Sequence, residues 1–264
     1  MQEYLLFTLL GITALVLLTN FMGQDAAASA TNWMSITLSS IVMFFAVSMV
    51  SKYGLKGNHG KAWILFMLFS AYWFCAETID VLYDVVLGSQ PWEYADDFFF
   101  ITGYQLFFAS LVFYLRPFSK QIPKKLILGI SAVSVSLLVP SLIMILDSES
   151  DMGDGNLLVL LAYPVLDSII LIPALIGVIL FFKGGVNFMM SLLFLGIITQ
   201  IIGHNSILFL SLLDSYYPGH LAGVLFLWTY ALFAFGLFNQ IGIFSGKPEN
   251  VSCPTCGNTC LGHG

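Results

Sequence analysis

Residues 72–113 read YWFCAETIDVLYDVVLGSQPWEYADDFFFITGYQLFFASLVF. The stretch joins an apolar run carrying three carboxylates, a polar turn and an aromatic run. The same layout returns later in the chain without a gap, so that Tyr104-Gln-Leu-Phe has its counterpart in Tyr230-Ala-Leu-Phe. The repetition predicts a membrane domain over residues 1–245, built as two parallel four-helix halves over about 1–118 and 119–245.

The composition is that of an integral membrane protein. Hydrophobic residues make up 58% of the chain and charged residues only 9%, which is too apolar for a soluble globular domain. Long continuous apolar runs, each enough to cross roughly 30 Å of hydrocarbon as a helix, favour an all-α bundle over a β-barrel. Eight runs are predicted to span the membrane: 4–22, 32–52, 61–87, 94–115, 125–147, 157–182, 187–213 and 220–244.

The basic residues predict the orientation of the bundle. All nine Lys and Arg residues fall in alternate connections or in the C-terminal tail, whereas the other connections carry only acids. Because Lys and Arg are enriched on the cytoplasmic side, both termini are expected to face the cytoplasm of a cell-membrane protein. The first apolar run follows Met1-Gln-Glu-Tyr4, which lacks the positive charge of a signal peptide, so we expect it to be retained as a helix.

The third predicted helix carries an unusual set of acids. Glu77, Asp80 and Asp84 are spaced i, i+3 and i+7 and therefore share one helix face. Charged side chains in lipid cost at least a few kcal/mol each, so this face is expected to turn into the bundle as part of a ligand or proton site. The alternative is that Asp80 and Asp84 only reach the membrane interface.

Asp167, His204 and Asn205 complete the candidate site. Asp167 follows Tyr163-Pro164 in the sixth predicted helix, and its expected depth equals that of Glu77. If these side chains face one another, the site can bind a cation, pass protons or sense pH, because histidine changes charge near neutral pH. The alternative is a structural hydrogen-bonded cluster that holds the helices together.

The remaining polar and aromatic residues of the repeat have simpler interpretations. The aromatic residues common to both copies, including Tyr104 and Tyr230, are interpreted as packing and interface anchors. Asp96 and Asp97 stand in the first turn of a predicted helix, where acids suit the positive end of the helix dipole.

Three motifs carry a family resemblance: Tyr163-Pro-x-x-Asp167, Asp214-Ser-Tyr-Tyr-Pro-Gly-His220 and Phe226-Leu-Trp-Thr-Tyr230. They resemble the multi-helix membrane sensor regions that precede the kinase domain in archaeal and bacterial sensory histidine kinases, and similar regions precede diguanylate cyclases. The likeness covers about Trp63 to Phe244 and implies signal perception at or within the membrane. The chain departs from such sensors after the last helix, where no kinase or cyclase sequence follows, so we expect another protein to carry the signal onward.

Residues 246–264 form a short Cys-rich tail. Cys253, Cys256, Cys260 and His263 supply four N/S ligands at close spacing, a set that suits tetrahedral zinc or, with soft thiolates, Cu(I). The alternatives are a disordered tail without a ligand and a dithiol redox pair, for which Cys-Pro-x-Cys is also suited.

These features predict a stand-alone membrane sensor or signalling adaptor, with a cytoplasmic or membrane protein as its partner. One alternative is a metal-handling protein or transporter that uses the Cys-rich tail and the acidic and histidine side chains expected at one depth in the membrane. Another is a structural subunit of a membrane complex. No nucleotide loop, catalytic triad or nucleic-acid motif is found, so we expect neither an enzyme nor a nucleic-acid partner.

Overall fold

A computed structural model of the 264-residue chain describes residues 2–83, 95–147, 154–181 and 188–245. Within these ranges the chain folds into eight long helices, joined in two places through short 3-10 helices, η2 (Arg116–Gln121) and η4 (Leu221–Gly223). The long helices are α1 (Gln2–Met22), α2 (Gln24–Tyr53), α3 (Gly57–Val81), α4 (Ala95–Leu115), α5 (Lys124–Asp147), α6 (Asp154–Phe181), α7 (Phe188–Leu212) and α8 (Val224–Ser245).

All eight helices are long and apolar enough to cross a membrane. The protein is therefore a multi-pass helical membrane protein, as predicted. Its outer surface carries large apolar side chains, such as Leu128 at 73% exposure on α5 and Phe44 at 68% exposure on α2. Such residues suit contact with lipid rather than with water.

One helix boundary differs clearly from the prediction. The second span was expected to begin at residue 32, but α2 already begins at Gln24. Gly23 reverses the chain in a single step with a φ of 118°, a conformation that glycine adopts without strain. The alanine-rich residues 26–30 are strong helix formers and extend the helix towards this turn.

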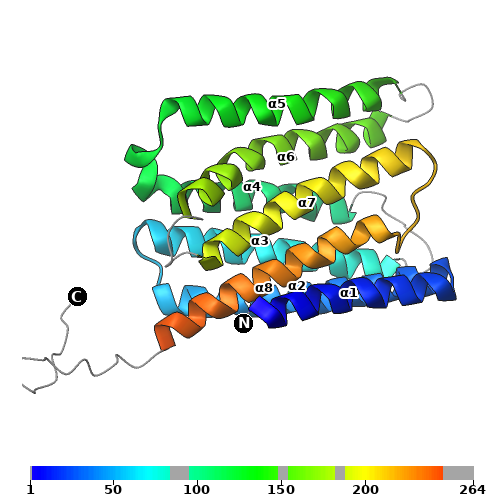
Figure 1. Ribbon diagram of the computed structural model, residues 1–264, viewed down its shortest axis with the longest axis horizontal. Helices are drawn as coiled ribbons and strands as arrows, with labels where there is room; N and C mark the ends of the chain where they lie inside the picture. The colour runs from blue at the N-terminus through cyan, green and yellow to red at the C-terminus, as the bar shows by residue number, and fades with distance from the viewer. Residues whose placement is uncertain (1, 84–94, 148–153, 182–187, 246–264) are drawn as a thin grey trace, which may run out of the picture.

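The helices run side by side, so that their ends gather at two poles (Figure 1). We call the pole where α2 ends, α3 begins, α4 ends and α5 begins the basic end, because it holds every described lysine and arginine. We call the opposite pole, where α3 ends and α4 begins, the acidic end. The helices α3 and α4 pack most extensively, whereas α1 and α5 lie at the periphery, at opposite edges of the bundle in Figure 1.

The core of the bundle is aromatic. We name Trp63, Phe66, Phe69 and Trp73 the aromatic column, because they follow one face of α3 from the basic end towards the acidic end. Successive ring centroids lie 5.8, 5.4 and 4.6 Å apart, within the range of favourable aromatic contacts. Each of the four side chains is at most 3% exposed.

Rings from other helices enclose the column. Phe107 of α4 stacks on Phe69 with a centroid distance of 4.2 Å, and Phe233 of α8 meets Phe66, Phe69 and Phe107 edge-on. At the basic end, Trp63 stacks on Tyr53 of α2. The middle of the bundle is therefore a packed core that joins α2, α3, α4 and α8.

At the acidic end, hydrogen bonds join the connection between α7 and α8 to the last turn of α1. Tyr217 donates a hydrogen bond to Asn20 Oδ1 at 2.7 Å, and Asn20 Nδ2 donates to the carbonyl oxygen of Gly219 at 3.0 Å. Gly219 has a φ of 83°, and a Cβ there would lie 2.4 Å from backbone atoms of Ala27 and Ala28. Only glycine fits this close approach between the connection and α2.

Replacing Gly219 by alanine is therefore expected to destabilise the protein by about 1–3 kcal/mol, from backbone strain and from the clash with α2. Thermal unfolding in detergent micelles measures the effect. The matched control is Gly223→Ala, because a Cβ at Gly223 meets nothing within 4 Å. Equal melting temperatures for the two variants would contradict the prediction.

Candidate functional site

A cavity of about 550 Å³ with several ionisable side chains occupies the acidic end of the bundle. Side chains from α2, α3, α4, α6, α7 and α8 line it, together with residues of the connection between α7 and α8. Its ionisable acidic and histidine side chains are Glu77, Asp80, Asp96, Asp97, Asp167 and His204. Among the residues that the structure describes, no lysine or arginine lines it.

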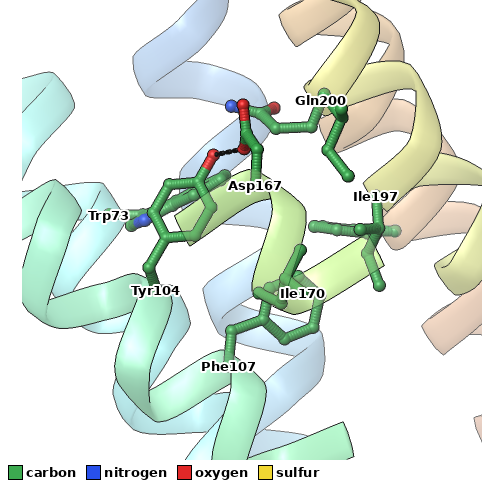
Figure 2. Close-up of a pocket in the computed structure, with 9 residues that line it drawn as sticks. Trp73, Tyr104, Phe107, Asp167, Ile170, Ile197 and Gln200 are labelled. Atoms are coloured by element: carbon green, nitrogen blue, oxygen red, sulfur yellow. Dashed lines mark hydrogen bonds between the residues drawn. The ribbon is translucent and has the colours of Figure 1, made fainter. Parts of the chain in front are cut away.

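Asp167, Tyr104 and His204 form the buried centre of the site. The Tyr104 hydroxyl donates a hydrogen bond to Asp167 Oδ1 at 2.7 Å, and the two side chains are each only 2% exposed. His204 Nδ1 lies 3.1 Å from Asp167 Oδ2 and 2.8 Å from the Tyr104 oxygen. Figure 2 shows the Tyr104 hydroxyl and the Asp167 carboxylate meeting beside Gln200 and above the ring of Trp73.

The contacts around His204 favour a proton on its Nδ1. The Tyr104 hydroxyl proton is already directed at Asp167, so His204 Nδ1 must carry its own proton to make a favourable contact with the carboxylate. The other ring nitrogen, His204 Nε2, lies 3.2 Å from the amide nitrogen of Gln200. Gln200 Oε1 is buried without a hydrogen-bond partner.

Glu77 and Tyr230 form a second hydrogen-bonded pair of a carboxylate and a tyrosine. The Tyr230 hydroxyl of α8 donates a hydrogen bond to Glu77 Oε1 of α3 at 2.6 Å. Tyr230 is 3% exposed. Trp73 lies between the two pairs, with ring centroids 5.6 Å from Tyr104 and 6.1 Å from Tyr230.

Further hydrogen bonds hold the walls of the cavity together. Tyr163 of α6 donates to Asp97 Oδ1 of α4. Ser141 of α5 donates to Asn205 Oδ1 at 2.8 Å, and the Asn205 amide donates to the carbonyl oxygen of Ile201. These contacts tie α4 to α6 and α5 to α7 beside the cavity.

The packed core closes the cavity towards the middle of the membrane. The void beneath Tyr104 and Gln200, against Trp73, Phe107 and Phe233, measures only about 10 Å³. A single water molecule needs roughly that much space. The aromatic core thus forms a floor, and the cavity belongs to the acidic end alone.

The predicted site residues converge as far as the structure describes them. Glu77, Asp80, Asp167, His204 and Asn205 all line this one cavity. Asp84 lies outside the described residues, and so do the predicted metal ligands Cys253, Cys256, Cys260 and His263. Within the described ranges, the cavity included, no group of three His, Cys, Asp or Glu side chains is arranged to hold a metal ion.

Sequence reasoning missed four members of the site. Tyr104 and Tyr230 were interpreted as packing residues and Asp97 as a helix-dipole partner, yet all three make hydrogen bonds in the cavity wall. Gln200 was not considered. Two signals were available: the tyrosines occupy the same position in the two copies of the predicted repeat, and Gln200 stands one helical turn before His204.

Comparison with known protein families, curated proteins and solved structures finds no match to this chain.

Proposed function

We propose that this protein is a stand-alone membrane sensor that binds its stimulus in the cavity and reports through the basic end to a cytoplasmic protein partner. One observation carries the proposal. Two of the five carboxylates of the cavity, Glu77 and Asp167, are hydrogen-bonded to tyrosines whose rings contact Trp73, the last member of the aromatic column.

The column gives the cavity a physical connection to the basic end. A ligand that engages Glu77 or Asp167 acts on Tyr230 or Tyr104, and each ring packs directly on Trp73. The column then continues to Trp63, which stacks on Tyr53, and the Tyr53 hydroxyl accepts a hydrogen bond from Gln240 of α8 at 2.8 Å. Close-packed cores of this kind transmit displacement because they resist gradual deformation.

The pattern of helix packing supports a duplicated architecture within this sensor. In the proposed repeat, α1–α4 correspond to α5–α8. Packing of α2 against α8 then has its counterpart in packing of α6 against α4, and both contacts are present. The contact between α1 and α8 lacks a matching contact of comparable extent, so the proposed halves differ at the periphery.

The orientation of the sensor is part of the proposal. The basic end would face the cytoplasm, because lysine and arginine accumulate in cytoplasmic connections. The cavity would then open towards the outside and receive an external stimulus. This arrangement agrees with the resemblance to the membrane regions of sensory histidine kinases.

A substitution in the cavity is therefore expected to change the local stability of the basic end. Glu77→Gln weakens the acceptor of the Tyr230 hydrogen bond, so we expect altered deuterium uptake over residues 52–60, where α2 ends and α3 begins. Hydrogen–deuterium exchange in lipid nanodiscs measures this, because it reports local opening. The matched control is Asp25→Asn, an exposed acid of α2 outside the cavity lining.

Two results would argue against the sensor. Unchanged exchange at residues 52–60 in Glu77→Gln would mean that the two ends are not coupled. Uptake of a cavity ligand into sealed proteoliposomes, abolished by Asp167→Asn, would indicate a transporter instead.

A further inference from the structure

We propose that the cavity binds an organic ammonium ion, whose charge is received by Glu77 and Asp167 and which donates an N–H hydrogen bond to Gln200 Oε1. This inference rests on the proposed function, because it names the chemical class of the stimulus for the same cavity.

The charge of the lining selects for a cation. Five carboxylates line the cavity, and none of the described lysines or arginines does. His204 Nδ1 lies 3.1 Å from Asp167 Oδ2. At membrane depth charges are poorly screened, so an anion would meet strong repulsion and a cation would be attracted.

The size of the cavity selects for an organic molecule. A volume of about 550 Å³ lies within the range of pockets that enclose drug-sized ligands, and it exceeds what a single metal ion needs. No three of the described His, Cys, Asp and Glu side chains are arranged to hold a metal ion. The rings of Phe100, Phe226 and Tyr163 contribute apolar walls, which suit the carbon skeleton of a ligand and attract a cation over their faces.

Gln200 independently indicates a ligand that donates hydrogen bonds. Its side chain lines the cavity, is only 7% exposed, and leaves Oε1 without a partner. A buried acceptor in this state carries a desolvation penalty, which a donor from a ligand would remove. An ammonium group supplies such donors, whereas a quaternary ammonium does not.

The two tyrosine–carboxylate pairs prepare the site for this charge. Hydrogen bonds from Tyr230 and Tyr104 hold Glu77 and Asp167 in place. Each carboxylate oxygen can accept more than one hydrogen bond, so both groups can bind the ligand without losing their tyrosines. Because the pairs flank Trp73, binding would act directly on the aromatic column.

The test uses calorimetric titration of the full chain in phosphatidylcholine nanodiscs, a lipid whose headgroup has no N–H. The probes are matched amine and alcohol pairs of increasing size: butylamine and butanol, phenethylamine and 2-phenylethanol, and tryptamine and tryptophol. At least one amine is expected to bind at millimolar concentration or below, with its alcohol weaker by about tenfold or more. Overturning results are that no amine binds or that the alcohols bind equally well.

Variants of the lining test the assigned contacts. Glu77→Gln and Asp167→Asn are each expected to weaken amine binding by about tenfold, and Gln200→Leu by a smaller factor. Asp147→Asn, at an exposed acid outside the cavity lining, is expected to have no effect. Amine binding that is unchanged in both carboxylate variants would overturn the proposal. If neither of these variants folds, the amine and alcohol comparison on the unaltered protein remains decisive.

A further experiment separates two sources of the ammonium group. In nanodiscs that contain phosphatidylethanolamine, weaker binding of the soluble amines would indicate competition from a lipid headgroup, and unchanged binding would indicate a water-soluble amine.

The proposed sensor function and the proposed ligand class can be overturned independently of each other. Amine binding without any change in exchange at residues 52–60 would overturn the sensor and leave the ligand class standing. The opposite result, coupling in Glu77→Gln without amine binding, would overturn the ligand class alone.

Discussion

Replacing Asp167 by alanine is expected to destabilise the protein and to break the centre of the cavity. The change removes the acceptor of the Tyr104 hydroxyl, and His204 Nδ1 keeps only its contact with the Tyr104 oxygen at 2.8 Å. A buried donor left unpaired costs about 1–3 kcal/mol, although interhelical hydrogen bonds measured in a membrane protein average nearer 0.6 kcal/mol. Asp167→Asn retains one carbonyl oxygen as an acceptor, so a smaller loss is expected.

A double-mutant cycle with Tyr104→Phe isolates the hydrogen bond between the two side chains. Unfolding by dodecyl sulfate in mixed micelles gives the free energy for each variant. We expect a coupling energy of about 0.5–3 kcal/mol, the range found for residues in direct contact. Two results would show that the buried pair does not hold α4 to α6. One is a coupling energy of zero, and the other is an Asp167→Ala variant as stable as Asp167→Asn.

Removing the ring of Phe69 is expected to have the largest effect on stability. Phe69 is 1% exposed and contacts Phe66, Trp73, Phe107 and Phe233. Truncation of a fully enclosed phenylalanine typically costs about 3–5 kcal/mol, because the surrounding side chains collapse only partly into the space. Phe69→Ala should therefore unfold at a much lower dodecyl sulfate fraction than the unaltered protein.

Phe44→Ala provides the matched control. The Phe44 ring is 68% exposed on the outer face of α2, where lipid replaces the lost contacts. Its change in unfolding free energy is expected to stay within about 0.5 kcal/mol. If the two alanine variants prove equally stable, the column is not the packed core described above.

The helices could be predicted from the sequence because hydropathy and length act locally. Apolar runs of about 20 residues have few alternatives to a transmembrane helix, and each predicted run overlaps one helix of the structure. The early start of α2 was missed because the alanine-rich residues after Gly23 are only moderately apolar. They extend the helix through intrinsic propensity, which a hydropathy argument does not register.

The depth of the site residues in the membrane could be predicted from the sequence, but the direction in which each helix turns its side chains could not. Counting residues from the outer end placed Glu77, Asp167 and His204 at one level, but rotation about each helix axis depends on packing between segments far apart in the chain. The roles of Tyr104 and Tyr230 depend on the same packing. A tyrosine in an apolar helix looks like an interface anchor until its neighbour is known, and here each neighbour is a carboxylate on another helix.

The two tyrosine–carboxylate hydrogen bonds join segments that are 63 and 153 residues apart. A ribosome makes the chain from its N-terminus, so α3 and α4 are synthesised before α6 and α8. Until the later helices arrive, Glu77 and Tyr104 are in the membrane without their final partners, a state that lipid penalises. The order of synthesis therefore makes the newly inserted first half the vulnerable stage of assembly, and the last helix, α8, brings the tyrosine that completes the Glu77 pair.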